Sequence, residues 1–273
     1  MQGKRVLITG GNSGIGKITA IELAKLGAEV ILACRDSDKT RAALEEIGEH
    51  GDVKNLPVNL ASFASVRDLA TAFLGSYDRL DVLINNAGTF PAKLTMTEDG
   101  FETQFGVNHL GHFLLTNLLL DCLKASAPSR VITVTSKLHK NGAIDFDSFR
   151  GEHGYNSQKA YGQSKLANVL FAVELAAKLE GTNVTSNVLH PGAVRTNIMR
   201  EMPWLLRSVI NLFFIDARKG AKTNIMLASD PELENISGKY FDQCEPDDYA
   251  ESANDSALRQ RLWDQSQSMT QTA

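Results

Sequence analysis

Short runs of apolar, mostly β-branched residues alternate with longer amphipathic stretches along the chain. A fully buried strand reads as a short apolar run, whereas a surface helix repeats apolar residues every three or four positions, so the alternation predicts interleaved strands and helices. The predicted strands are Arg5–Thr9, Glu29–Cys34, Lys54–Val58, Leu80–Asn85, Arg130–Thr135, Asn183–Leu189 and Lys239–Phe241. The predicted helices are Gly16–Leu26, Ser37–His50, Ser62–Ser76, Phe101–Lys124 and Gln158–Leu179.

Two of these strands, at Val30–Ala33 and Val82–Ile84, are apolar at every position. Such strands are buried on both faces, which is typical of a parallel sheet covered by helices. The order of elements therefore predicts an α/β fold, a Rossmann-like doubly wound parallel sheet with helices on both faces. We find no internal repeat, low-complexity tract or linker, so residues 1–273 are expected to form a single domain.

The segment Arg195–Ile215 breaks this alternation, because it is rich in large apolar residues yet follows the sixth predicted strand, where a ligand crevice is expected. One interpretation is a flap over an apolar substrate. The other is a helix buried against the main body of the protein. The sequence favours neither over the other.

The composition, with 43% hydrophobic and 22% charged residues, is ordinary for a globular protein in water. A net charge of −4 gives no reason to expect a nucleic acid partner. The three widely separated cysteines predict neither a disulfide framework nor a zinc site and fit a reducing compartment. The chain starts without a secretory signal and holds no run of 18 apolar residues, so we expect a cytoplasmic protein without a membrane span.

A glycine-rich turn, Thr9–Gly16, directly follows the first predicted strand and opens the first helix. A turn in this position presents backbone N–H groups and the positive end of the helix dipole to a pyrophosphate. The missing side chains at Gly10, Gly14 and Gly16 would let the backbone approach the phosphates and the helix approach the sheet. The turn therefore predicts a dinucleotide site.

Tyr161 and Lys165 are four residues apart on a predicted helix and so share one face of it. A neighbouring ammonium stabilises a phenolate, so Lys165 is expected to lower the pKa of Tyr161 and make it an acid/base group near neutral pH. This spacing occurs by chance on many helices, so its weight depends on the other motifs.

Those motifs follow in a fixed order. The turn Thr9–Gly16 reads Thr-Gly-x-x-x-Gly-Ile-Gly, Asn85–Gly88 reads Asn-Asn-Ala-Gly, and the Tyr-x-x-x-Lys pair comes later. With Asn108, Ser136 and Pro191-Gly192, they resemble the short-chain dehydrogenase/reductase family over about Lys4 to Ser266.

The resemblance implies hydride transfer between a nicotinamide and a carbonyl or alcohol carbon. It implies that Tyr161 donates or accepts the proton, Lys165 supports it and holds the nicotinamide ribose, and Ser136 binds the carbonyl oxygen. The family pattern selects Ser136 over its neighbour Thr135. Asn108 would position a water that links Lys165 to solvent, or serve only as a structural residue at a helix kink.

The end of the second strand indicates which nicotinamide is bound. Family alignment puts Cys34 where NAD-binding members have a carboxylate, and Arg35 follows, able to pair with a 2′-phosphate. NADP(H) is therefore the expected cofactor. We expect Asp36 to cap the next helix. For Lys17 two interpretations stay open: it adds positive charge near the phosphate, or it is an exposed helix lysine.

The resemblance places other residues near the cofactor. Asn59 stands where the family usually has aspartate, and it would lie near the adenine or cap a helix. Thr196 would bind the nicotinamide carboxamide, and Val194 would offer a backbone contact. The complete expected cofactor set is Gly10, Asn12, Ser13, Gly14, Ile15, Gly16, Arg35, Asn59, Leu60, Asn86, Ala87, Gly88, Tyr161, Lys165, Pro191, Gly192, Val194 and Thr196.

Further short sequence segments narrow the resemblance to the retinol dehydrogenase-like branch of the family, which includes relatives of the WW-domain oxidoreductase and protochlorophyllide reductase. They are Gly14–Lys17, Ala33–Asp36, Asn108–Phe113, Ser164–Asn168, Ser237–Phe241 and Leu262-Trp263. Membrane-bound members carry an N-terminal hydrophobic anchor, which we do not find here. The leading hypothesis is a soluble NADP-dependent carbonyl reductase or alcohol dehydrogenase that acts on a fairly apolar small molecule.

Two alternatives stay open. One is a retinaldehyde or steroid dehydrogenase at a membrane surface, with Trp204–Ile215 as an interfacial helix. The other is an NADP-binding regulatory protein with vestigial chemistry. The family often pairs subunits, so a homo-oligomer is possible.

Two features remain, the long interval between Ser136 and Tyr161 and a group of three histidines. The 25 positions between Ser136 and Tyr161 exceed the usual family interval, and Ile144–Phe149 within them is expected to border the substrate cleft. His109, His112 and His139 lack flanking carboxylates, so we assign them to packing or solvent and expect no metal.

Overall fold

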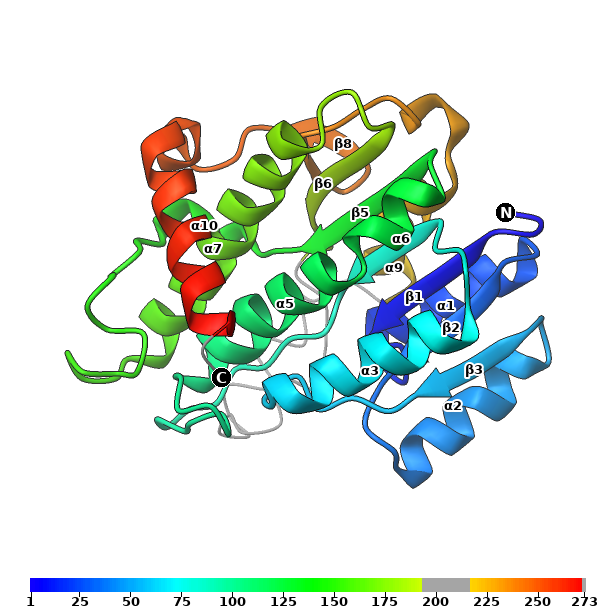
Figure 1. The fold of residues 1–273 in the computed structure, drawn as a ribbon, viewed down its shortest axis with the longest axis horizontal. Helices are drawn as coiled ribbons and strands as arrows, with labels where there is room; N and C mark the ends of the chain where they lie inside the picture. The colour runs from blue at the N-terminus through cyan, green and yellow to red at the C-terminus, as the bar shows by residue number, and fades with distance from the viewer. Residues whose placement is uncertain (193–216, 272–273) are drawn as a thin grey trace.

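One sheet runs through the molecule, with its strands in the order β3-β2-β1-β4-β5-β6-β7-β8 (Figure 1). The structure, a computed structural model, describes residues 1–192 and 217–271. The strands are β1 (Arg5–Thr9), β2 (Glu29–Ala33), β3 (Val53–Leu56), β4 (Val82–Asn85), β5 (Ser129–Val134), β6 (Val184–His190), β7 (Tyr240–Asp242) and β8 (Glu245–Asp247). Every predicted strand is present with its ends within a few residues, and β8 is an addition.

All neighbouring strands pair in parallel except β7 and β8, which are antiparallel. The chain moves outward from β1 to β3 and then returns to place β4 on the other side of β1. In open α/β sheets, ligands bind at the carboxyl ends of the strands where the order reverses in this way. The junction of β1 and β4 is therefore the place to look for a site.

The central strands are buried on both faces, as their continuous apolar sequences predict. In β1, Leu7 joins the hydrophobic core on one side of the sheet, whereas Val6 and Ile8 join the core on the other. In β4, Leu83 and Ile84 divide in the same way. This two-sided burial confirms the doubly wound fold.

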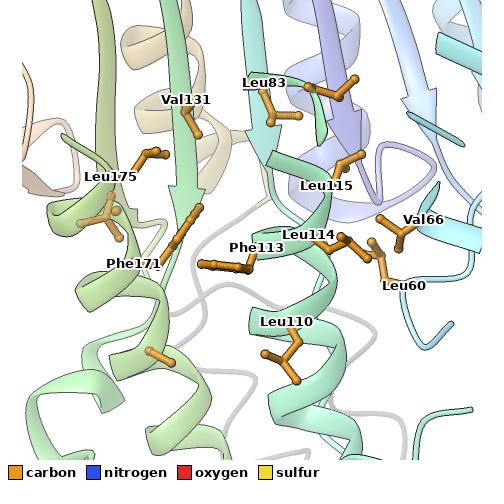
Figure 2. Packing of buried hydrophobic residues seen from close by; sticks show 14 of the residues in the cluster. Leu60, Val66, Leu83, Leu110, Phe113, Leu114, Leu115, Val131, Phe171 and Leu175 are labelled. Carbon is orange, nitrogen blue, oxygen red and sulfur yellow. The ribbon is translucent and has the colours of Figure 1, made fainter. Parts of the chain in front are cut away.

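The helices form a layer on each face of the sheet (Figure 1). The helices α1 (Gly14–Lys25), α2 (Asp38–Gly48) and α9 (Ala217–Ser229) pack on one face, and α3 (Phe63–Ser76), α5 (Gly111–Leu118) and α7 (Ser157–Lys178) on the other. Figure 2 shows the second layer, where Phe113 of α5 points toward Phe171 of α7 with ring centroids 5.6 Å apart.

The helix predicted over Phe101–Lys124 is not continuous. It divides into α4 (Thr103–Phe105), the π-helical turn η1 (Gly106–Leu110), α5 and α6 (Leu120–Ala125). In η1 the Gly111 amide bonds to the Gly106 carbonyl, five residues earlier. Such π turns recur at functional sites in proteins, and this one carries Asn108.

Two helices were not predicted, α9 and α10 (Ser256–Gln271). In α10 the buried positions are Leu262, Ser266 and Thr270, so its buried stripe is mostly polar. Its Trp263 stacks on Phe171, with ring centroids 5.9 Å apart. Figure 1 shows α10 lying along α7 on the outside of this layer.

The remaining elements of residues 1–192 and 217–271 are the short helices η2 (Lys137–Asn141), η4 (Pro231–Leu233) and η5 (Glu251–Asn254). The predicted flap over 195–215 lies outside the described residues. Among the helices in 1–192 and 217–271, none is long and apolar enough to cross a bilayer.

Replacement of Trp263 by alanine tests how far α10 stabilises the fold. The indole contacts Phe113 at 5.0 Å and Phe171 at 5.9 Å between ring centroids. We expect Trp263→Ala to lower the free energy of unfolding by about 3 kcal/mol, because it removes most of an aromatic side chain from a packed contact. Urea denaturation measures the loss, with the neighbouring exposed Asp264→Ala as control. Equal stability of both variants would show that α10 contributes little.

Candidate active site

The glycine turn lies at the carboxyl end of β1, directly before α1. Gly10 and Gly14 have φ of +68° and +53°, a region that favours glycine. A Cβ on Gly16 would come within 2.5 Å of the Gly10 carbonyl oxygen, so the turn can close only on glycine there. Among the residues that the structure describes, none would come within 4 Å of a Cβ at Gly14, so the rest of the described chain leaves the backbone at the start of α1 uncovered. Ser13 occupies the N-cap of α1 without a side-chain capping bond.

The loop Asn86–Thr89, which follows β4, packs directly on this turn. A Cβ on Gly10 would lie 3.1 Å from Ala87 Cα. The Asn86 and Ala87 amides both donate to Thr9 Oγ1 at 2.9 Å, and the Asn86 side chain donates to the Thr9 carbonyl at 2.8 Å. The predicted motifs after β1 and β4 thus meet at the junction of the two strands.

The end of β2 lies beneath the same turn. The Cys34 thiol is buried, and desolvation raises its pKa despite hydrogen bonding from backbone amides of the turn. Asn12 Nδ2 donates to Thr40 Oγ1 at 2.8 Å, and Thr40 Oγ1 donates to the Arg35 carbonyl at 2.7 Å. The Asn12 side chain therefore ties the glycine turn to the loop that carries the exposed Arg35.

Three polar residues near this edge have local partners. Ser37 is the N-cap of α2, because its Oγ accepts a hydrogen bond from the Thr40 amide. Asp36 instead pairs with Arg41, so the prediction that Asp36 caps this helix was wrong. Lys17 pairs with Glu46 at 2.6 Å.

Asn59 follows β3, and its Oδ1 accepts from the Ala61 amide while Nδ2 donates to Glu98. The N-cap of α3 is Ser62, so Asn59 stabilises the turn before the helix. Two apolar members of the expected cofactor set are largely buried. Ile15 packs with Ala221 of α9, and Leu60 packs in the core.

Tyr161 and Lys165 lie on successive turns near the start of α7. Asn156 caps the helix by accepting from the amides of Gln158 and Lys159. Lys165 Nζ lies 5.5 Å from the centroid of the Tyr161 ring and donates to the Val134 carbonyl at 3.1 Å. The spacing therefore places the two side chains together, as predicted.

The pKa of Tyr161 differs from the sequence expectation. Burial raises it to about 12, and a hydrogen bond with the Ser136 side chain opposes the rise. Burial also lowers the pKa of Lys165 to about 8. The expected lowering of the Tyr161 pKa by Lys165 is not seen, because the ammonium lies over the ring and bonds to a carbonyl while desolvation penalises both charged forms.

Ser136 follows β5 and begins η2. Its neighbour Thr135 donates to the Lys165 carbonyl at 2.7 Å, so that hydroxyl holds β5 against α7. The Ser136 hydroxyl hydrogen-bonds with Tyr161 and accepts from the Leu138 amide at 3.3 Å. The backbones of η2 and α7 approach so closely that a Cβ on Gly142 would lie 2.4 Å from the Gly162 carbonyl oxygen.

The Asn108 side chain joins the loop after β4 to α7. Its Oδ1 accepts from the Thr89 amide at 2.8 Å, while Nδ2 donates to the Thr89 carbonyl at 3.1 Å and to Ser164 Oγ at 3.0 Å. Ser164 in turn donates to the Tyr161 carbonyl. A Cβ on Gly88 would lie 3.6 Å from Lys165 Nζ, so this glycine lets the lysine reach the loop.

Sequence reasoning missed Phe90, whose ring packs edge-on against Tyr161 with centroids 5.0 Å apart. Phe90 comes two residues after the Asn-Asn-Ala-Gly motif, and an aromatic residue at that point was the available signal. Leu138, two residues after Ser136, is an exposed apolar side chain on η2. Phe90 thus places an apolar ring directly against the phenol.

The insertion between Ser136 and Tyr161 packs partly into the core. Phe149 stacks on Phe105 with ring centroids 4.3 Å apart, and the Asp145 amide donates to Gln163 of α7. This part of the predicted cleft border therefore supports α7 as well.

The three histidines singled out above are buried. His109 bonds to Ser266 of α10, His112 to Thr9 and the Asn108 carbonyl, and His139 Nδ1 to the Ser136 carbonyl. Across 1–192 and 217–271, no cluster of three or more His, Cys, Asp or Glu could hold a metal ion.

Pro191 and Gly192 follow β6 at the same edge of the sheet, and Gly192 has φ of +86°. The last two residues of the expected cofactor set, Val194 and Thr196, lie outside the described residues.

The part of the chain that forms this site matches a known protein family. The family described as short chain dehydrogenase matches residues 4–204, which include the glycine turn, Ser136 and the Tyr161/Lys165 pair. The chain belongs to the short chain dehydrogenase family and is an oxidoreductase of that type.

Its similarity to curated relatives extends over nearly the whole chain. Mouse retinol dehydrogenase 14 is 50% identical over 288 residues, covering 98% of this chain and 86% of that protein. Human retinol dehydrogenase 13 is 47% identical over 278 residues, covering 97% of this chain and 83% of its own length. The protein is therefore a short chain dehydrogenase homologous to retinol dehydrogenases.

Two solved structures share the fold. An uncharacterized protein from Mycobacterium paratuberculosis has a TM-score of 0.83 at 35% identity, covering 99% of this chain and 94% of that chain. Pseudomonas aeruginosa RhlG, described in an NADP active-site complex, has a TM-score of 0.74 at 27% identity, covering 89% and 95%.

Lys165→Met tests the electrostatic cost of the site. Burial lowers the pKa of Lys165 to about 8, so the lysine is still mostly protonated at pH 7, but its charge costs more free energy in the folded protein than in the unfolded chain. We expect the variant to gain about 2 kcal/mol in the free energy of unfolding at pH 7. The unfolded lysine keeps its proton up to about pH 10.4, so this gain should shrink as pH rises above 8.

Urea denaturation at pH 7 and pH 10 measures the effect. Lys178→Met, on the same helix but half-exposed and paired with Glu174, is the control and should change stability by less than about 0.5 kcal/mol. A Lys165→Met protein less stable than wild type at pH 7 would contradict the expected cost.

Proposed function

We propose that this protein is an NADP(H)-dependent oxidoreductase that transfers a hydride between the nicotinamide and a carbonyl or alcohol carbon of an apolar small molecule, with Tyr161 as the acid/base group. The observation that carries the proposal is the proximity of Lys165 Nζ to the Tyr161 ring, 5.5 Å from its centroid, beside the loop that follows β4. The proposed catalytic residues are Asn108, Ser136, Tyr161 and Lys165.

The residues at the β1/β4 junction fit a dinucleotide. The positive φ of Gly10 and Gly14, and the lack of any described residue within 4 Å of a Cβ at Gly14, leave backbone amides at the start of α1 available to a pyrophosphate. Arg35 is exposed just after β2, and its guanidinium forms no ion pair with another residue of 1–192 or 217–271. A guanidinium can bind a 2′-phosphate, whereas Cys34 offers no carboxylate for the ribose hydroxyls of NAD.

The cofactor, when bound, would supply or accept the hydride, and the side chains would move the proton. With a pKa of about 12, Tyr161 keeps its proton at neutral pH and is ready to donate it to a carbonyl oxygen that receives a hydride. Ser136, which hydrogen-bonds with Tyr161, would bind the same oxygen as negative charge develops. Lys165, with a pKa of about 8, remains mostly charged at pH 7 and would stabilise the phenolate left behind.

An apolar substrate is supported by the side chains around the phenol. Phe90 packs against the Tyr161 ring, and Leu138 lies exposed on η2 beside Ser136. The homologous retinol dehydrogenases carry the name of an apolar alcohol. We therefore include retinoids among the proposed substrates, together with other apolar aldehydes and ketones.

Two alternative functions have less support than the proposed one. Retinaldehyde or steroid conversion at a membrane surface would need the segment 204–215, which lies outside the described residues. An NADP-binding regulatory protein would not need Ser136, Tyr161 and Lys165 together, and their mutual contacts favour catalysis. We also propose a cytoplasmic location, because the three widely separated cysteines fit a reducing compartment.

Turnover tests the proposal. Purified protein with NADPH is assayed against retinal, medium-chain aldehydes and steroid ketones, by loss of NADPH absorbance. We expect reduction of at least one apolar carbonyl, and a Tyr161→Phe variant at least about 100-fold slower with nearly unchanged NADPH affinity, because it loses only the transferable proton. Tight NADPH binding without turnover of any substrate would favour the regulatory alternative. A Tyr161→Phe rate equal to wild type would remove the proposed acid/base role.

Cofactor preference has its own test. Arg35→Ala should weaken NADPH binding by about tenfold or more and leave NADH binding within about twofold, because only NADPH carries the 2′-phosphate. Titration of nucleotide fluorescence gives both dissociation constants. Arg41→Ala is the matched control, since Arg41 is an exposed arginine of α2 already paired with Asp36. An equal loss of NADPH and NADH affinity in Arg35→Ala would refute the assignment.

A further inference from the structure

His112 is buried beneath the site, and both of its ring nitrogens are bonded. Its side chain is on the first turn of α5 and is 1% exposed. Nδ1 lies 3.0 Å from the Asn108 carbonyl oxygen, and Nε2 lies 2.8 Å from Thr9 Oγ1. These bonds join η1 to the carboxyl end of β1.

The partners of His112 determine where its proton lies. A carbonyl oxygen only accepts hydrogen bonds, so Nδ1 carries the proton and donates it to Asn108. In the neutral ring Nε2 is then an acceptor, and the Thr9 hydroxyl donates to it. Burial, together with the charge of Lys165, lowers the pKa of His112 to about 4, so the ring is neutral at pH 7. His109, on the preceding turn, is the other titratable group in its electrostatic range.

This arrangement sets the direction of the Thr9 hydroxyl. With its hydrogen on His112, Thr9 Oγ1 presents both lone pairs to the Asn86 and Ala87 amides, each at 2.9 Å. Without the imidazole, the hydroxyl can instead donate to the Ile84 carbonyl, which lies 3.4 Å away. A turn of the hydroxyl toward Ile84 would move its lone pairs away from the two amides.

The second bond of His112 reaches the other end of the same loop. Its Nδ1 holds the carbonyl of Asn108, and the Asn108 side chain binds both the amide and the carbonyl of Thr89. One imidazole is therefore connected to the start of the loop through Thr9 and to its end through Asn108. Between these anchors, Gly88 lies next to Lys165 Nζ.

We propose that His112 is a positioning residue that holds the Asn86–Thr89 loop, through Thr9 at one end and Asn108 at the other, in the conformation that receives the dinucleotide. This inference rests on the proposed function for the identity of the ligand. Its effect on the loop itself does not depend on any ligand.

Hydrogen–deuterium exchange of the free protein is the first test. In His112→Phe, which keeps a ring but neither nitrogen, the amides of Asn86, Ala87 and Thr89 should exchange at least about tenfold faster than in wild type, the equivalent of one lost hydrogen bond. The matched control is His109→Phe. His109 is equally buried on the preceding turn but bonds to Ser266 of α10, so its loss should not change exchange in this loop. Equal exchange of the loop in the two variants would overturn the inference.

Nucleotide binding is the second test. We expect His112→Phe to weaken NADPH binding about tenfold, and His109→Phe to weaken it less than twofold at a similar loss of melting temperature. An unchanged NADPH affinity in His112→Phe would overturn the role in receiving the dinucleotide. If wild type binds neither NADPH nor NADH, the proposed function fails, while faster exchange in His112→Phe would still support the loop anchoring.

A comparison of two Thr9 variants keeps the test valid if His112→Phe folds poorly, and a double-mutant cycle extends it if His112→Phe folds. Thr9→Val removes the hydroxyl and should loosen the loop, whereas Thr9→Ser keeps the hydroxyl and should lose much less. In the Thr9→Val background, the addition of His112→Phe should cost less NADPH affinity than it does in wild type, because one of its two routes to the loop is already absent. Equal losses in Thr9→Ser and Thr9→Val, or additive losses in the double variant, would contradict the coupling.

Discussion

Burial of a parallel sheet on both faces is the constraint on which the rest of this structure depends. With Leu7 on one side and Val6 and Ile8 on the other, β1 has no surface left for polar chemistry along its length. Along β1 the polar groups of a site can therefore gather only where the strand ends, and the reversal of strand order opens a gap between that end and the end of β4. The glycine turn after β1, the loop after β4 and the hydroxyls after β5 all lie at that edge. The position of the site thus follows from the burial of the sheet on both faces.

Much of this arrangement could be predicted from the sequence. The strands β1, β2 and β4 have continuous apolar runs at their centres, so they were found with small errors at their ends. The contact of Tyr161 with Lys165 follows from helical geometry alone, and the meeting of the motifs after β1 and β4 follows from parallel topology. These features depend on periodicity and order, which a sequence displays directly.

Other features depend on which polar groups find partners in three dimensions. The stripe that α10 buries contains Ser266 and Thr270, so no apolar period marks that helix. The π turn changes hydrogen-bond register around Asn108 without changing the apolar pattern of the sequence. The raised pKa of Tyr161 results from desolvation, which the four-residue spacing does not report. His112 looks like any apolar-face histidine until its two partners are known.

The packing of α10 on α7 has a consequence for the order in which the protein can be made. The helix that carries Tyr161 and Lys165 is covered on its outer side by residues synthesised much later, among them Leu262 and Trp263. Contacts between segments so distant in sequence form late and slow the search for the native state. A nascent chain that has emerged only as far as β6 holds every proposed catalytic residue but lacks the cover of its catalytic helix. We expect such a chain to expose the aromatic face of α7 and to be prone to aggregation until synthesis is nearly finished.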